Sequence, residues 1–152
     1  MSILNFNYQN PTRIIFGQGQ IAEISNYIPK DKKVFMCYGK GSIKRNGVYD
    51  QVMTALKGYE VTEFQGIEAN PDYDTLMKAV AILKENGPEN YFILAVGGGS
   101  ISDGCKFIAM AAFYNGENPY EDLLVRGGVD CHKSVPLGVI MTLPATGSES
   151  NH

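Results

Sequence analysis

The sequence contains few of the residues that build a metal site, a disulfide framework or a membrane span. Its 152 residues include three cysteines, Cys37, Cys105 and Cys131, and two histidines, His132 and His152. An odd number of widely spaced cysteines argues against a disulfide framework and predicts a reducing, cytoplasmic location. The sequence shows no His/Cys/Asp cluster typical of a complete metal site. No apolar stretch approaches the ~20 residues of a membrane span, and the N-terminus lacks the pattern of a signal peptide.

An excess of charge of one sign is also missing. The formal net charge is −3, which gives no electrostatic reason to expect nucleic acid or an anionic membrane as a partner. Hydrophobic residues make up 44% of the chain and charged residues 19%, a composition that is typical of a folded protein. The length is sufficient for one domain with a hydrophobic core.

Strand-like and helix-like segments alternate along the chain. We expect strands at residues 12–16, 33–38, 60–64, 91–96 and 135–143, and helices at 20–27, 48–56, from 72 or 74 to about 85, and at 102–114. The apolar run KVFMCY at 33–38 is typical of a buried parallel strand. The repeated strand–turn–helix order predicts an α/β fold, with a Rossmann-like parallel sheet and helices on both faces.

Three consecutive glycines follow the most apolar of these strands. Gly97, Gly98, Gly99 and Ser100 precede the helix expected from 102. Ligands of open α/β sheets bind beyond the carboxyl ends of the strands, and glycine lets backbone N–H groups approach an anion there. The positive end of the helix dipole favours an anion as well, so a pyrophosphate is the natural occupant. A tight turn without a ligand is the alternative, and the pattern is not the GxGxxG fingerprint.

Two further turns follow strands in the same way. In YGKGSIK at 38–44, Gly39 occupies the place where NAD-selective sites often carry an acidic residue, and Lys40, Ser42 and Lys44 offer donors for a 2′-phosphate. A solvated basic loop is the alternative. LPATGSES at 143–150 offers hydroxyl groups near a backbone shaped by proline and glycine, although any polar loop has this composition.

Taken together, these segments resemble the group III, iron-dependent alcohol dehydrogenases, and most of all their NADPH-dependent aldehyde reductase and butanol dehydrogenase branch. The matching stretches include LAVGGGSISDGCKFIA at 94–109 and PLGVIMTLPATGSESN at 136–151, together with NPTRIIFGQGQI, YGKGSIKRNGVYDQV and FQGIEANPDYDTL earlier in the chain. They occur in order over nearly the whole sequence.

The resemblance implies a set of NADP(H)-binding residues. The segment 97–100 would hold the pyrophosphate, and Asp103 would lie near the nicotinamide carboxamide and ribose. Asn70 would flank the adenosine. Gly39 would favour NADPH, with Lys40 and Ser42 near the 2′-phosphate. The full cofactor-binding set implied is Gly39, Lys40, Gly41, Ser42, Asn70, Gly97, Gly98, Gly99, Ser100, Asp103, Thr142, Leu143, Thr146 and Ser148.

The resemblance also implies hydride transfer between NADPH and an aldehyde or primary alcohol, with a divalent metal, iron or zinc, polarising the substrate oxygen. The metal ligands of the family, an Asp and three His, lie in a helical second domain and have no counterparts in residues 1–152. His132 is expected to be a solvated loop residue. We therefore expect one incomplete nucleotide-binding domain that binds NADPH without reducing aldehydes, and that self-associates as a homodimer or larger assembly through exposed sheet edges.

Two other functions remain open from the sequence. The pattern GGGSxxD also occurs in glycerol-dehydrogenase-like and dehydroquinate-synthase-like enzymes, although TRIIFGQG and LPATGSES argue against them. The second alternative is a non-catalytic nucleotide-binding or assembly module.

Overall fold

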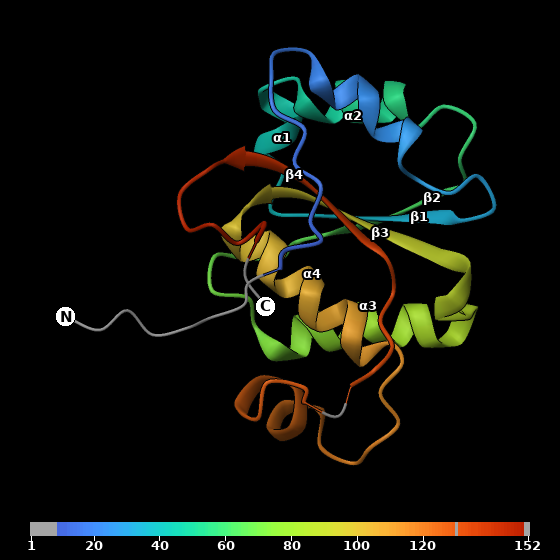
Figure 1. Cartoon of the computed structure of the whole chain (residues 1–152), viewed down its shortest axis with the longest axis vertical. Coiled ribbons are helices and arrows are strands. Elements are labelled where there is room, and N and C mark those ends of the chain that lie inside the picture. Colours follow the sequence, from blue (N-terminus) through green and yellow to red (C-terminus); the bar gives the residue numbers. More distant parts are fainter. Residues whose placement is uncertain (1–8, 130, 151–152) are drawn as a thin grey trace.

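Four parallel strands form the sheet in the computed structural model, which describes residues 9–129 and 131–150. They are β1 (Lys33–Tyr38), β2 (Val61–Gln65), β3 (Tyr91–Gly98) and β4 (Leu137–Leu143). Their order in the sheet is β2-β1-β3-β4, and every neighbouring pair is parallel. Figure 1 shows the sheet between two layers of helices. The predicted α/β class and the parallel sheet are confirmed.

The two central strands are buried on both faces, which explains their continuous apolar sequences. Because successive side chains point to opposite faces of a strand, each strand contributes to two hydrophobic clusters. Phe35 and Ile93 belong to the cluster beneath the sheet in Figure 1, whereas Met36 and Leu94 belong to the cluster above it. All four side chains are fully buried.

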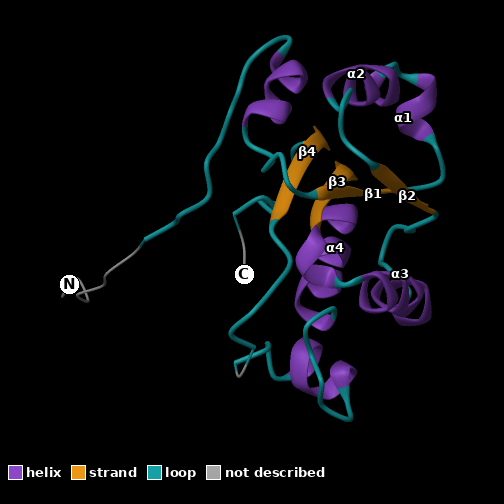
Figure 2. Cartoon of the chain, turned by 90° about the vertical axis from the view of Figure 1, so that its right-hand side faces the viewer, coloured by secondary structure: helices purple, strands orange, loops and turns teal. Residues whose placement is uncertain are grey.

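The helices divide between the two faces according to the strand that they follow. The short α1 (Ser42–Arg45) and α2 (Val48–Ala55) follow β1 and cover one face, together with the 3₁₀ segment Gln20–Asn26. The opposite face is covered by α3 (Tyr73–Asn86) and α4 (Gly99–Ala111), which follow β2 and β3 (Figure 2). Crossovers between parallel strands are right-handed, so connections that run in opposite directions along the sheet place their helices on opposite faces.

The chain reverses its direction across the sheet between β1 and β3. It runs from β1 outward to β2, then crosses back to β3 on the other side of β1, and continues to β4. The loops that leave β1 and β3 therefore diverge to opposite faces of the sheet. This reversal is a topological switch point. It leaves a crevice at the carboxyl ends of the two strands, where open α/β sheets bind their ligands.

The most distinct helix start is that of α3. Asp72 has an extended backbone conformation, and its carboxylate accepts a hydrogen bond of 3.0 Å from the backbone N–H of Thr75. This is the geometry of an N-cap residue. The prediction named Asp72 or Asp74 as the cap, and the structure selects Asp72.

The strand predicted at residues 12–16 is wrong. This segment is extended but pairs with no strand among the described residues, and Ile14 and Phe16 are 67% and 96% exposed. Its β-favouring composition cannot form a strand without a neighbour to accept and donate hydrogen bonds. The helix predicted from 102 begins at Gly99 instead, because β3 passes into α4 almost without a loop. The segment predicted as a helix at 20–27 is a 3₁₀ helix.

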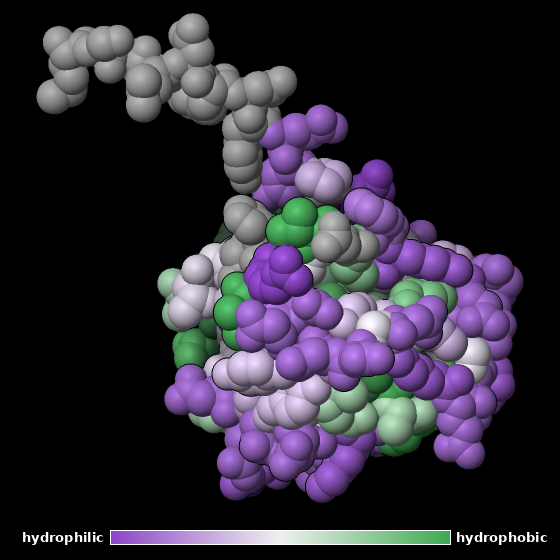
Figure 3. All heavy atoms as spheres, turned by 90° about the horizontal axis from the view of Figure 1, so that it is seen from below, coloured by the Kyte–Doolittle hydropathy of each residue, from purple (hydrophilic) through white to green (hydrophobic). Residues whose placement is uncertain are grey.

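Hydrophobic side chains are scattered over a mainly hydrophilic surface on the side of the molecule seen in Figure 3. Within the described residues, no helix is long and apolar enough to cross a membrane.

Candidate functional site: a glycine-lined cleft at the strand ends

A cleft of about 450 Å³ opens at the carboxyl ends of β1 and β3, where the chain reverses across the sheet. One side is formed by the residues that end β3 and begin α4. The other side is formed by the loops that follow β1 and β2. Eleven of the described residues line it: Gly39, Lys40, Ser42, Ile67, Glu68, Ala69, Val96, Gly97, Gly98, Ile101 and Thr142.

The three consecutive glycines differ in the space that a side chain would have at each position. A Cβ atom on Gly97 would lie 2.6 Å from Cγ1 of Ile101 in the first turn of α4. A Cβ atom on Gly99 would lie 2.6 Å from the hydroxyl oxygen of Thr146. A Cβ atom on Gly98 would meet no heavy atom within 4 Å. Of the three, Gly98 alone has open space beside it, and Gly98 lines the cleft.

The turn at residues 146–148 packs against the first turns of α4. The hydroxyl oxygens of Thr146 and Ser148 are 2.6 Å apart, and the Ser148 hydroxyl donates to the Asp103 carboxylate at 3.2 Å. The Ser148 carbonyl oxygen accepts from the Lys106 ammonium at 2.6 Å and from the Ser102 hydroxyl at 3.2 Å. This network fixes the turn that follows β4 against the glycine segment.

Charges in this network lie close to one another in a partly buried setting. Burial lowers the pKa of the Lys106 ammonium, although the carboxylates of Asp103 and Glu149 oppose that shift. The Oε2 atom of Glu149 is buried, and within residues 9–129 and 131–150 it finds no hydrogen-bond partner.

The loop after β1 carries the charged part of the cleft. The Lys40 ammonium is 2.6 Å from the Glu68 carboxylate, and both side chains are more than half exposed. Gly39 approaches the next loop closely, since a Cβ atom there would lie 3.2 Å from the carbonyl oxygen of Ile67. An acidic side chain at position 39 would have to displace this loop by a few tenths of an ångström.

Tyr38, Tyr49 and Glu63 form a hydrogen-bonded cluster at the end of β1. The hydroxyls of Tyr38 and Tyr49 donate to the two carboxylate oxygens of Glu63 at 2.6 and 2.8 Å. Burial, followed by the hydrogen bond to Glu63, raises the pKa of Tyr38 to about 12. The Lys44 ammonium lies over both tyrosine rings, 5.2 and 4.9 Å from their centroids. Lys44, one of the donors predicted for a 2′-phosphate, thus makes its contacts with aromatic rings.

The structure separates the fourteen predicted cofactor-binding residues into two groups. Six line the cleft: Gly39, Lys40, Ser42, Gly97, Gly98 and Thr142. The others surround it. Gly41, with a φ of 106°, precedes α1, while Gly99 and Ser100 form the first turn of α4. Asp103, Thr146 and Ser148 belong to the network on α4, Leu143 ends β4, and Asn70 follows the lining residue Ala69 in a left-handed conformation.

Five lining residues were not predicted: Ile67, Glu68, Ala69, Val96 and Ile101. The first three follow β2 and share the position, directly after a parallel strand, that singled out the two glycine turns. That rule could have found them, but GIEA at 66–69 has neither a run of glycines nor several hydroxyls to draw attention to it.

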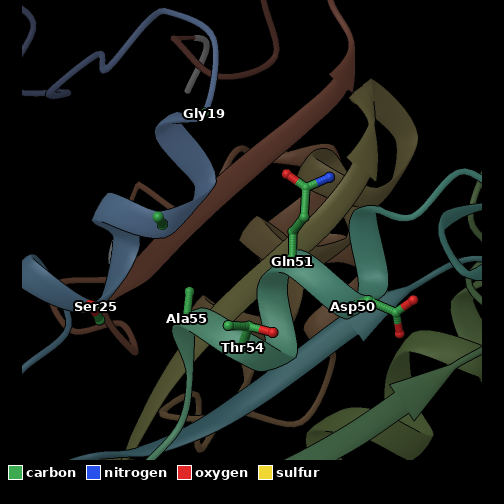
Figure 4. Close-up of a pocket in the computed structure, with 7 residues that line it drawn as sticks. Gly19, Ser25, Asp50, Gln51, Thr54 and Ala55 are labelled. Carbon is green, nitrogen blue, oxygen red and sulfur yellow. The ribbon is translucent and has the colours of Figure 1, made fainter.

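A second cleft, of about 510 Å³, lies between the segment Gln20–Asn26 and α2 (Figure 4). Small side chains such as Ala22 and Ala55 line it, and Asp50 is the one ionised group among the lining residues that the structure describes. It lies away from the strand ends, and its described lining residues include no cation to hold a phosphate. The switch-point cleft is therefore the better candidate for a ligand site.

No metal site is found within the described residues, 9–129 and 131–150. No group of three His, Cys, Asp or Glu side chains comes together there to hold a metal ion. His132 is an exposed loop residue, as predicted, and His152 lies outside the described residues. The residues that the structure describes do not fit the divalent metal implied by the resemblance.

An open parallel sheet, with a glycine-lined cleft where the chain reverses, defines the class of doubly wound α/β proteins, which bind their ligands at such points. Comparison with known proteins narrows the class. A model of the family described as "Iron-containing alcohol dehydrogenase" matches residues 11–152. The chain belongs to the iron-containing alcohol dehydrogenase family.

The similar proteins include both NADPH- and NADH-dependent enzymes. The chain is 52% identical over 147 residues to the NADPH-dependent aldehyde reductase YqhD of Escherichia coli, covering 97% of this chain and 38% of that protein. It is 44% identical to the probable NADH-dependent butanol dehydrogenase 1 of Bacillus subtilis, over 97% of this chain and 37% of the relative. A crystal structure of E. coli YqhD superimposes with a TM-score of 0.91, covering 97% of this chain and 37% of that one.

These matches place the chain in the predicted branch. They also show that it spans less than two fifths of the length of these relatives.

Proposed function

We propose that this chain binds NADP(H) as the nucleotide-binding part of a metal-dependent alcohol dehydrogenase or aldehyde reductase. The observation that carries the proposal is the cleft at the switch point, because open space beside Gly98 meets the N-terminus of a 13-residue helix there. Backbone N–H groups and the helix dipole together favour a pyrophosphate at this position.

The rest of the cleft suits the two ends of the cofactor. Lys40 and Ser42 offer an ammonium and a hydroxyl to the adenosine 2′-phosphate, and Ile67 and Ala69 offer apolar surface to the adenine. On the other side, Thr142 near the end of β4 would face the nicotinamide part. The bound nicotinamide would supply the hydride in the whole enzyme. We assign no step to a metal, because the described residues do not form a site for one.

Titration of the purified 152-residue chain with NADPH and with NADH, followed by nicotinamide fluorescence, tests the proposal. We expect saturable binding of NADPH, tighter than that of NADH. Binding of neither cofactor would overturn it.

A second assay measures oxidation of NADPH coupled to an aldehyde in the presence of added Zn²⁺ or Fe²⁺. We expect no turnover by the 152-residue chain, so that binding without catalysis would be its property. Metal-dependent turnover would contradict this expectation and would show that residues 1–152 hold a complete active site.

A further inference from the structure

We propose that Glu68 is a specificity-determining residue that weakens the discrimination between NADPH and NADH at this cleft. The inference rests on the proposed function, since it concerns the adenosine end of the same cofactor. It begins from one contact: the Glu68 carboxylate lies 2.6 Å from the ammonium of Lys40, the cation that the proposed function assigns to the 2′-phosphate.

The backbone places Glu68 there. The carbonyl oxygen of Tyr38, the last residue of β1, accepts hydrogen bonds from the backbone N–H groups of Gly66 and Ile67, at 3.0 and 3.3 Å. The Ile67 side chain is 1% exposed and anchors the segment in the core. Glu68 follows directly, so the fold holds its carboxylate beside the loop that leaves β1.

Among the described residues that line the cleft, Lys40 and Glu68 are the two with ionised side chains. Both come from its adenosine side, and the glycine side contributes neither charge. A group attached to the adenosine ribose therefore meets a cation and an anion together. The 2′-phosphate of NADPH is attracted by Lys40 and repelled by Glu68. The 2′-hydroxyl of NADH can donate a hydrogen bond to the Glu68 carboxylate, as it does to the acidic residue of NAD-selective sites.

The pair thus provides opposite interactions for the two cofactors from one position. With Gly39 at the end of β1, this chain has no acidic side chain at the position where NAD-selective sites often carry one. Glu68, in the loop after β2, places a carboxylate beside the same part of the cleft. Because both side chains are more than half exposed, water and salt screen their charges. The resulting discrimination is moderate and depends on ionic strength.

The variant Glu68→Gln tests this assignment, with Glu60→Gln as the matched control. Glu60 forms a second exposed Lys–Glu pair, with Lys33 at 2.8 Å, and Glu60 is not among the lining residues of the cleft. The two variants change the net charge equally and each breaks one surface ion pair. The dissociation constants of NADPH and NADH are measured for the wild type and both variants.

We expect Glu68→Gln to raise the preference for NADPH over NADH by about two- to fivefold, the range of exposed charge interactions. The increase should shrink from ~0.01 M to ~1 M salt, because the Debye length falls from about 30 to about 3 Å. Glu60→Gln should leave the preference unchanged.

The outcomes separate this inference from the proposed function. If the wild type binds NADPH but Glu68→Gln leaves the preference unchanged, or changes it no more than Glu60→Gln does, Glu68 has no role in specificity. If the wild type binds neither cofactor, the proposed function fails and this inference fails with it.

Discussion

At the scale of single residues, the three glycines at 97–99 have different roles, some in packing and one at the cleft. Gly97 and Gly99 have no room for a side chain because other parts of the chain occupy that space, whereas Gly98 has open space beside it. Packing therefore requires glycine at positions 97 and 99, whereas at position 98 we expect the ligand to require it.

The variants Gly98→Ala and Gly97→Ala make this difference measurable. Gly98→Ala should keep the stability of the wild type, since its φ of −86° suits any residue and its Cβ meets nothing. It should weaken NADPH binding by about tenfold or more, because a methyl group would displace a phosphate from one charge-assisted hydrogen bond.

Gly97→Ala serves as the contrast. It should lower the free energy of unfolding by about 1–3 kcal/mol, the usual cost of overpacking, because its Cβ would collide with the branched side chain of Ile101. Urea denaturation and fluorescence titration of both variants check the pair. Equal losses of stability would contradict the distinction.

Tyr38 makes stability depend on pH in the alkaline range. Its pKa rises from 10.0 to about 12 on folding, so the folded state retains the phenolic proton at a pH where the unfolded chain loses it. The resulting stability is fully present below pH 10.0 and is lost as the pH rises through about 12.

The variant Tyr38→Phe should lack this component of the alkaline decline. It should also be less stable near neutral pH by about 1–2 kcal/mol, through loss of a hydrogen bond to a carboxylate. Urea denaturation between pH 8 and about 12 measures both effects. If the free energy of unfolding of the variant declined with alkaline pH in parallel with that of the wild type, Tyr38 would not be the cause of the decline.

At the scale of elements, the N-cap of α3 gives a direct test of local structure. Asp72→Ala should destabilise the chain by about 1 kcal/mol because the Thr75 N–H loses its acceptor. Asp72→Asn, which keeps an oxygen acceptor, should restore most of that loss. Asp74→Ala, in the same first turn, should cost less. Thermal unfolding followed by circular dichroism measures all three, and equal effects of the two alanine variants would contradict the assignment of the cap.

Elements whose own residues carry a clear pattern could be predicted from the sequence. The apolar runs of β1 and β3 and the cap of α3 are such patterns, and the structure has these elements within one or two residues of their predicted bounds at most ends. Residues 12–16 have the composition of a strand but pair with no strand in the described part of the chain, and composition does not reveal whether a partner strand is present. The predicted boundary at 102 failed because the compact passage from β3 into α4 depends on how Gly97 packs against Ile101.

The candidate site could be predicted in the same partial way. Turns after parallel strands indicated residues such as Gly39 and Gly98, because strand ends meet at one edge of the sheet. The contact of Thr146 and Ser148 with Gly99 could not be predicted, since it joins residues far apart in the sequence. The pairing of Lys40 with Glu68 likewise depends on the hydrogen bonds that hold residues 66 and 67 to the end of β1.

At the scale of the whole molecule, exposed apolar residues and an unpaired strand edge favour self-association. Within the described residues, β4 has β3 as its one neighbour, and Phe16 is 96% exposed. Unpaired edges and exposed apolar side chains are typical contact sites between chains.

We expect the sedimentation coefficient of the purified chain to rise with its concentration. Phe16→Ser should reduce this rise. Val129→Ser, a control at another position with 78% exposure, should have a smaller effect. A sedimentation coefficient that stays at the monomer value over the whole concentration range would contradict this prediction and, with it, the expected homodimer. The cytoplasmic location and the absence of nucleic-acid and membrane partners also stay predictions.

The open space beside Gly98 has a consequence for comparing other sequences of this fold. A chain with a larger residue in place of Gly97 or Gly99 would have to repack its neighbours, so such a change would mark an altered fold around the cleft. A chain with a larger residue in place of Gly98 would keep the same architecture with its cleft obstructed. The residue at position 98 would then distinguish relatives that bind a nucleotide from relatives that have the same fold without binding one.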